Sequence, residues 1–222
     1  MELQEKESVK SKVLKASIKL FMENGYEKTT MRAIASAANV NYGSLMFAFK
    51  DKDSIVSELV GYVIDCQFEM VSHLLKNKTQ DKILQYAVET VLQLHIAESS
   101  EHMREMYNVS YSMPKSSLVV YGNITKKLQN IFGSHLPNLK EKDFYELEIA
   151  SAGIMRNFIS MPCNMYFTME RKVNRFLETT MLVYRVDDTK IQECINFIKH
   201  FDFVELAEKT IDKMLEYVEH KI

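Results

Sequence analysis

Apolar side chains recur every three or four residues along almost the whole chain, and this spacing limits its possible folds more than any other feature. Val9, Val13, Leu20 and Phe21 begin the pattern, which has the period of one face of an α-helix. Glycine and proline, which mark the turns between strands, occur only six and three times in 222 residues. The chain is therefore predicted to be all-α, with helices at 8–24, 31–38, 42–49, 52–76, 80–98, 101–111, 115–132, 140–160, 167–183, 188–200 and 203–220.

Two of these predicted helices are short and adjacent, and each follows a good capping residue. Thr30 precedes 31–38 and Asn41 precedes 42–49, and both side chains can accept hydrogen bonds from backbone N–H groups at a helix start. Gly25 follows the first helix, where a left-handed cap commonly ends a helix. Ala35 and Ala38 are small, so the short helices can approach each other. The N-terminal part is predicted to be a three-helix unit containing a helix-turn-helix, whose last helix fits the major groove of DNA.

Charge is distributed unevenly along the chain. Residues 10–52 contain eight basic and three acidic residues, a net charge of +5, whereas the whole chain has a net charge of −2, which leaves −7 elsewhere. A basic N-terminal part on an acidic body favours a polyanionic partner. A solvated helix face would give the same pattern, so charge alone does not decide between the two.

Residues 9–60 carry further residue types at fixed spacing. They are Phe21, Gly25-Tyr26, Thr29-Thr30, Ile34-Ala35, Val40, Gly43-Ser44-Leu45, Phe49 and Lys52. This pattern resembles the DNA-binding segment of the tetracycline-repressor (TetR) family of transcriptional regulators, over about the first 60 residues. The resemblance implies a helix-turn-helix DNA-binding domain at 1–50, joined to a larger helical effector-binding and dimerisation domain at 51–222. It also implies a dimeric regulator, most commonly a repressor, that binds a palindromic operator in double-stranded DNA.

The predicted DNA contacts lie on the helix-turn-helix and at the start of the next helix. They are Thr30, Arg32, Asn41, Tyr42, Gly43, Ser44, Phe47, Lys50 and Lys52. The resemblance implies that Thr30 and Lys52 hold phosphates and that Arg32, Tyr42 and Ser44 lie at or near base edges. Arginine is the side chain best shaped to bind guanine there. Lys50 and Lys52 also flank a helix N-terminus, whose dipole favours an anion.

Two positions depart from the family pattern. Met46 stands where the family usually has a tyrosine that grips the DNA backbone, and methionine cannot donate a hydrogen bond. Ala48 stands where an aromatic residue or histidine is usual. These departures predict weaker or differently anchored DNA binding.

The middle helices offer soft and aromatic side chains for a ligand pocket, which the resemblance implies. The predicted lining is Met103, Met106, Tyr107, Tyr111, Tyr121, Met155, Phe158 and Met161. Methionine adapts to irregular shapes and suits a pliable pocket. We expect a small apolar or aromatic effector, although ordinary core packing would also account for each of these residues.

The resemblance further implies that two late helices of each subunit pair in a four-helix dimer interface. Apolar stripes suited to this role contain Phe144, Leu147, Ile154, Ile191, Ile195 and Ile198. The alternative is that the stripes pack only within the monomer.

Other functions have little support in the sequence. His95, Glu98 and His102 would share a helix face if the helix continued past Ser99-Ser100, but such residues are usually at the surface, so no metal and no cofactor are expected. Nucleophile-elbow, zinc-protease, P-loop and dinucleotide-binding motifs are lacking, so an enzyme is not expected.

The three cysteines, Cys66, Cys163 and Cys194, lie far apart, and no run is apolar enough to span a membrane. With a polar N-terminus that is no signal peptide, these features predict a cytoplasmic protein. Besides a ligand-responsive repressor, two alternatives remain: a helical ligand-binding or interaction protein whose DNA-binding head is relict, and a helical enzyme.

Overall fold

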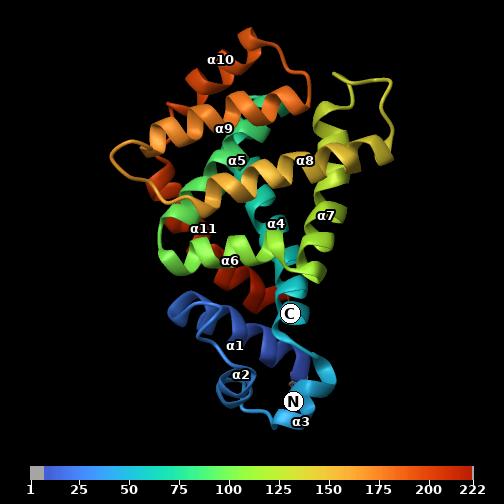
Figure 1. Ribbon diagram of the computed structural model, residues 1–222, viewed down its shortest axis with the longest axis vertical. Helices are drawn as coiled ribbons and strands as arrows, with labels where there is room; N and C mark the ends of the chain where they lie inside the picture. The colour runs from blue at the N-terminus through green and yellow to red at the C-terminus, as the bar shows by residue number, and fades with distance from the viewer. Residues whose placement is uncertain (1–7, 222) are drawn as a thin grey trace.

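A computed structural model describes residues 8–221 and folds them into eleven α-helices (Figure 1). These agree with the predicted helices to within a few residues, and the described part of the chain contains no strand. The outer ends of the two predicted domains, residues 1–7 and 222, lie outside the described residues. The helices are α1 (Val9–Asn24), α2 (Met31–Ala37), α3 (Tyr42–Ala48), α4 (Lys52–Leu75), α5 (Lys82–Glu98), α6 (Glu101–Ser112), α7 (Pro114–Phe132), α8 (Glu141–Ser160), α9 (Met169–Val183), α10 (Asp188–Ile198) and α11 (Phe203–Lys221).

Helices α1, α2 and α3 form a small head at one end of the molecule (Figure 1). Its core contains Phe21, Ile34 and Leu45, all fully buried. The two predicted caps are confirmed: Thr30 Oγ1 accepts a hydrogen bond from Ala33 N at 3.1 Å, and Asn41 Oδ1 accepts one from Ser44 N at 2.7 Å. Each short helix therefore begins where its capping residue predicted.

Gly25 ends α1 in a different conformation from the predicted left-handed cap. Its φ of 81° is positive as expected, but its ψ of 163° is extended. The chain therefore leaves α1 sharply, and the next two backbone N–H groups, those of Tyr26 and Glu27, point to the carboxylate of Glu105 on α6 at 3.0 and 2.8 Å. The α1–α2 turn is thus tied to the body.

Helix α5 lies at the centre of the larger body. It contacts α4 and every helix from α6 to α11, and Leu84, Val88, Val91 and Leu94 are among its many buried residues. Helix α4 runs directly from the head into the body, and α11 returns beside α4 to contact α1 (Figure 1). No helix among residues 8–221 combines the length and apolar character needed to cross a membrane.

The structure corrects most of the predicted dimer surface. Phe144, Ile191, Ile195 and Ile198 are buried within the chain itself. The isoleucine stripe belongs to α10, which packs against α5 and α9, so these side chains complete the monomer core. Of the six predicted residues, only Leu147 and Ile154 remain partly accessible.

Candidate DNA-binding head and internal cavity

The residues predicted to contact DNA lie mainly on the solvent-facing side of the head. Thr30, Arg32, Asn41, Tyr42, Gly43, Phe47 and Lys50 are exposed, whereas Ser44 and Lys52 are half-buried. The Phe47 side chain is 96% exposed, which is unusual for so large an apolar residue. The guanidinium carbon of Arg32 lies 6.0 Å from the centre of the Tyr42 ring. Arg32 from α2 and Tyr42 from α3 therefore share one surface.

The inner side of α3 holds it on the head. Leu45 and Phe49, four residues apart, are both buried. Met46 is half-buried against the same core, so the position that departs from the family pattern contributes packing. Ala48 is exposed and adds no polar group to the outer surface.

Lys52 has a structural contact that the sequence did not indicate. Its Nζ donates a hydrogen bond to the carbonyl oxygen of Tyr26 at 2.5 Å and lies 4.0 Å from the centre of the Tyr26 ring. Burial lowers the pKa of Lys52 from its usual value. The lysine thus fastens the first turn of α4 to the α1–α2 turn.

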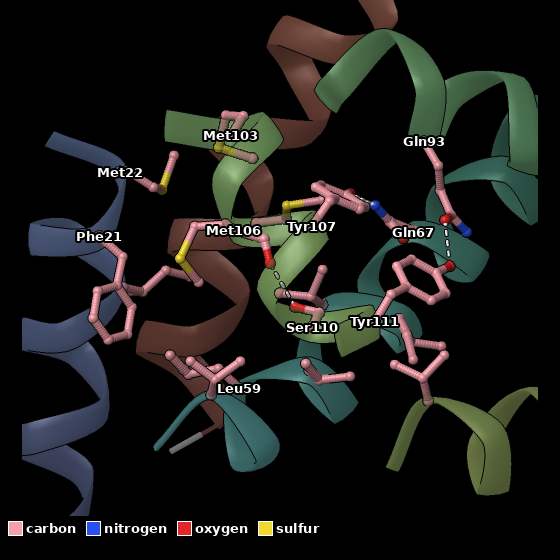
Figure 2. A pocket seen from close by; sticks show the side chains of 17 residues that line it. Phe21, Met22, Leu59, Gln67, Gln93, Met103, Met106, Tyr107, Ser110 and Tyr111 are labelled. Carbon is pink, nitrogen blue, oxygen red and sulfur yellow. Dashed lines mark hydrogen bonds between the residues drawn. The ribbon is translucent and has the colours of Figure 1, made fainter. Parts of the chain in front are cut away.

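A cavity of about 80 Å³ lies where the head meets the body (Figure 2). Four predicted pocket residues, Met103, Met106, Tyr107 and Tyr111, line it from α6. The sequence did not indicate its other walls, which come mainly from α1 and α4, with Gln93 from α5, Val120 from α7 and Met214 from α11. In Figure 2, Phe21 and Met22 lie at one end, whereas Gln67 and Gln93 lie at the other.

The other four predicted pocket residues do not line this cavity. Tyr121 packs edge-on against Tyr145, with ring centres 6.2 Å apart, and Met161 is 56% exposed. Phe158 packs on Phe167 and Phe176. Met155 and Phe158 belong to α8, which packs on α5, α6, α7 and α9. Among the described residues, α8 has no substantial contact with α1 or α4, which form the main walls of the cavity.

A smaller chamber of about 30 Å³ adjoins the cavity. Gln93 and Tyr111 line both spaces, and Met155 lines only the chamber. The chamber also contains the carboxyl groups of Glu89 and Glu148. Burial raises the pKa of Glu89 to about 7 and that of Glu148 to about 8. Neither glutamate was singled out from the sequence, where glutamate ordinarily indicates a surface position.

The three residues weighed as metal ligands have separate partners. His95 stacks on Phe203, and burial lowers its pKa to about 4. Glu98 pairs with Lys172 at 2.7 Å, and the Nδ1 atom of His102 lies 3.1 Å from the carbonyl oxygen of Met22. Within residues 8–221, no group of three or more His, Cys, Asp or Glu side chains is arranged to hold a metal ion.

A helix-turn-helix head with an exposed aromatic and basic surface, mounted on a larger helical body, defines a class of DNA-binding regulators. Residues 13–59 match the family model described as bacterial regulatory proteins, tetR family. Over these residues the head is therefore similar to the DNA-binding segment of the TetR family of transcriptional regulators.

Two sequence relatives are also transcriptional regulators. The chain is 24% identical over 160 residues to the probable HTH-type transcriptional regulator YttP of Bacillus subtilis, an alignment that covers 71% of this chain and 70% of YttP. It is also 24% identical over 152 residues to IcaR of Staphylococcus aureus, the negative transcriptional regulator of the biofilm operon icaADBC. That alignment covers 63% of this chain and 77% of IcaR. Both relatives are named as transcriptional regulators.

Solved structures share the fold at low sequence identity. RolR in complex with resorcinol aligns with a TM-score of 0.64 and 12% identity, over 86% of this chain and 92% of RolR. The multidrug binding protein EbrR, complexed with imidazole, aligns with a TM-score of 0.51 and 16% identity, over 83% and 99% of the two chains. At these identities the likeness concerns the fold alone.

Proposed function

We propose that the chain is a dimeric, sequence-specific repressor that leaves its operator when a small apolar or aromatic effector binds. Residues 1–50 would form the DNA-binding domain, and residues 51–222 would hold the effector and the partner subunit. The observation that carries this proposal is the outer surface of α2 and α3, where Phe47 is 96% exposed and Arg32 lies 6.0 Å from the centre of the Tyr42 ring.

The nine predicted residues would make two kinds of DNA contact, with base edges and with phosphates. Arg32 is suited to guanine, and the Phe47 ring can contact the methyl group of thymine. Lys50 and Lys52 would neutralise phosphates, which positions the head without reading sequence. Because Lys52 also binds the Tyr26 carbonyl, it would hold the head together while it contacts DNA.

The outer faces of α8 and α9 are the surface that we propose for dimerisation. Helices α8 and α9 pack side by side (Figure 1). Ile149 on α8 and Leu182 on α9 are exposed apolar residues, and Ala150 and Gly153 leave α8 open to close approach. Two-fold pairing there would present two heads to one duplex, as helix-turn-helix dimers require.

Helix α6 contacts both the cavity and the head, so it can couple ligand binding to the placement of the head. One of its faces contributes Met103, Met106 and Tyr107 to the cavity wall. The same helix contacts the last turn of α1 through His102 and binds the α1–α2 turn through Glu105. A ligand that binds better to one placement of α6 would therefore favour one placement of the head.

Repression is favoured by one relative, since IcaR is named a negative regulator. The alternative of a ligand-binding protein with a relict head is favoured by Met46, which cannot replace the hydroxyl of the family tyrosine. A gel-shift assay with DNA from around the protein's own gene separates the two. The repressor proposal predicts a complex that survives excess unrelated DNA and is weakened by Arg32→Ala, whereas the relict-head alternative predicts no sequence-specific complex.

A further inference from the structure

Two buried carboxyl groups face the small chamber in the centre of the body. Glu89 on α5 and Glu148 on α8 are only 3% and 4% exposed, and both line the chamber of about 30 Å³. The other described residues around it carry aromatic, aliphatic, thioether, hydroxyl or amide groups, and none of them is basic. Such a lining is suited to a positively charged group that comes from outside the chain.

Each carboxyl group has one neutral hydrogen-bond donor. Glu89 Oε1 accepts from Gln93 Nε2 at 2.6 Å, and Glu148 Oε2 accepts from Ser151 Oγ at 2.7 Å. Neither glutamate has an ion-pair partner in the described part of the chain, and the ammonium of Lys127, the one cation that acts on Glu89, is paired with Asp65 at 3.1 Å. A buried carboxylate is stable only when a cation is paired with it. The described residues supply no such cation to Glu89 or Glu148, so their ionised forms need one from outside the chain.

The chamber adjoins the larger cavity. Tyr111 donates a hydrogen bond to Gln93 Oε1 at 3.0 Å (Figure 2). Gln93 Nε2 in turn donates to Glu89 Oε1 at 2.6 Å. Gln93 and Tyr111 thus form the wall between the two spaces. A chamber of about 30 Å³ matches the size of one water molecule or one ammonium group, whereas the cavity of about 80 Å³ is largely apolar.

We propose that the effector is a small primary amine with an apolar body, whose ammonium group enters the chamber and binds Glu89 and Glu148. Its aromatic or aliphatic part would occupy the methionine-lined cavity, and Gln93 and Tyr111 would turn aside to let it pass. Phe68 and Phe176 also line the chamber. Aromatic rings attract cations, and the ammonium of Lys127 already lies 4.3 Å from the centre of the Phe68 ring. This inference rests on the ligand-responsive function proposed above and specifies the class of its ligand.

Binding of an amine should depend on pH through the two glutamates. Burial raises the pKa of Glu89 to about 7 and that of Glu148 to about 8, so both are largely protonated in acid and must lose protons to pair with ammonium. The titratable groups around them are Tyr86 on α5, Tyr107 and Tyr111 on α6, Lys127 on α7 and Tyr184 on α9. Burial raises the pKa of each of these tyrosines further above its usual value, so the tyrosines do not titrate between pH 6 and 8.

Isothermal titration calorimetry with three matched probes tests the proposal on the full-length chain. 4-Phenylbutylamine, 4-phenylbutan-1-ol and 4-phenylbutyrate share an apolar body and differ in head-group charge. At pH 8 the amine should bind at least about tenfold more tightly than the alcohol, and its affinity should fall by at least about tenfold between pH 8 and pH 6. Glu89→Gln and Glu148→Gln should each weaken the amine at least about tenfold and leave the alcohol unchanged.

Glu146→Gln is the matched control, because Glu146 is exposed on the same helix as Glu148. Equal affinity for amine and alcohol, preference for the carboxylate, no binding of any probe, or unchanged amine affinity in both glutamate variants would each overturn the proposal. If a variant does not fold, the unaltered chain provides the test. The proposal then requires that amine affinity fall from pH 8 to pH 6 and that protons be released on binding; absence of either would overturn it.

Gel shifts on the same protein keep the two proposals distinguishable. Failure to bind DNA specifically contradicts the repressor function, whether or not the amine binds. If the amine binds but leaves the DNA complex intact, its role as effector is excluded.

Discussion

Thr29 and Thr30 are neighbours in the sequence but have different environments in the head. Thr29 is buried, and its hydroxyl donates a hydrogen bond to the Gly25 carbonyl at 2.7 Å. Thr30 is exposed and caps α2. Lys50 and Lys52 form a similar pair, because only Lys52 binds the Tyr26 carbonyl. Substitution of Thr29 or Lys52 therefore changes contacts that hold the fold together, whereas substitution of Thr30 or Lys50 changes mainly the exposed surface.

Substitution of the two lysines should separate these contributions. Lys52→Ala should lower the free energy of unfolding by about 1 kcal/mol, because it removes a hydrogen bond and a ring contact. It should also weaken binding to all DNA sequences. Lys50→Ala should leave stability unchanged and reduce the slope of log affinity against log salt by about one. Urea unfolding and DNA binding at several salt concentrations measure the two effects, and an unchanged salt slope in Lys50→Ala would remove Lys50 from the phosphate contacts.

Two glycines of the head should respond differently to alanine. At Gly43 an added Cβ would meet only Asn41 Oδ1 at 3.4 Å, so Gly43→Ala should fold normally and weaken DNA binding by about tenfold if the backbone approaches DNA there. At Gly25 the φ is 81° and the Cβ would lie 2.4 Å from Glu105 Oε2, so Gly25→Ala should lower stability by about 2 kcal/mol. Thermal unfolding and gel shifts check both, and normal DNA affinity in Gly43→Ala would contradict the close approach.

At the scale of elements, α6 joins the cavity to the head through Glu105, which accepts hydrogen bonds from the N–H groups of Tyr26 and Glu27. Glu105→Ala should destabilise the protein by about 1–3 kcal/mol, since two backbone donors lose their acceptor. It should also weaken the effect of any ligand on DNA binding. Glu101→Ala, an exposed position on the same helix, is the control for thermal unfolding. Equal stability of the two variants would show that this link is not important.

The elements differ in how far they could be predicted from the sequence. Helix bounds and the caps at Thr30 and Asn41 depend on neighbouring residues, so local pattern was sufficient. The burial of Phe144 and of the α10 isoleucines depends on which distant helices cover them, which periodicity does not specify. The walls that α1 and α4 give the cavity were missed for the same reason. In α5 the polar residues Glu89, Thr90 and Gln93 are buried together with the apolar ones, whereas a polar stripe on a helix ordinarily indicates a side that faces solvent.

At the scale of the whole molecule, burial of two carboxyl groups should make stability depend on pH. The folded pKa values of Glu89 and Glu148, about 7 and about 8, lie above their usual value of 4.5. The folded state therefore holds more protons than the unfolded state in this range, and stability should fall as pH rises from about 5 to about 8. Glu148→Gln should reduce that fall by roughly 3 kcal/mol. Urea unfolding at pH 5, 7 and 9 measures it, and a variant with the same pH dependence as the original chain would contradict this account.

Dimer formation should depend on the outer face of α8. An added side chain at Gly153 would meet nothing within 4 Å inside the chain, so Gly153→Arg should fold normally and yet block a partner at this face. Light scattering should give twice the chain mass of 25.9 kDa for the original protein and a single chain mass for the variant. An original protein that stays monomeric at micromolar concentration would exclude the dimer, and a dimeric variant would move the interface elsewhere.

The central claim is that two heads, held by one paired body, read two sites on the same DNA. Hydroxyl-radical footprinting on DNA from around the protein's own gene tests it most directly. The account predicts two protected half-sites related by two-fold symmetry, with centres separated by about one helical turn of 10 base pairs or a multiple of it. Protection of a single half-site, or of no specific site, would contradict the account.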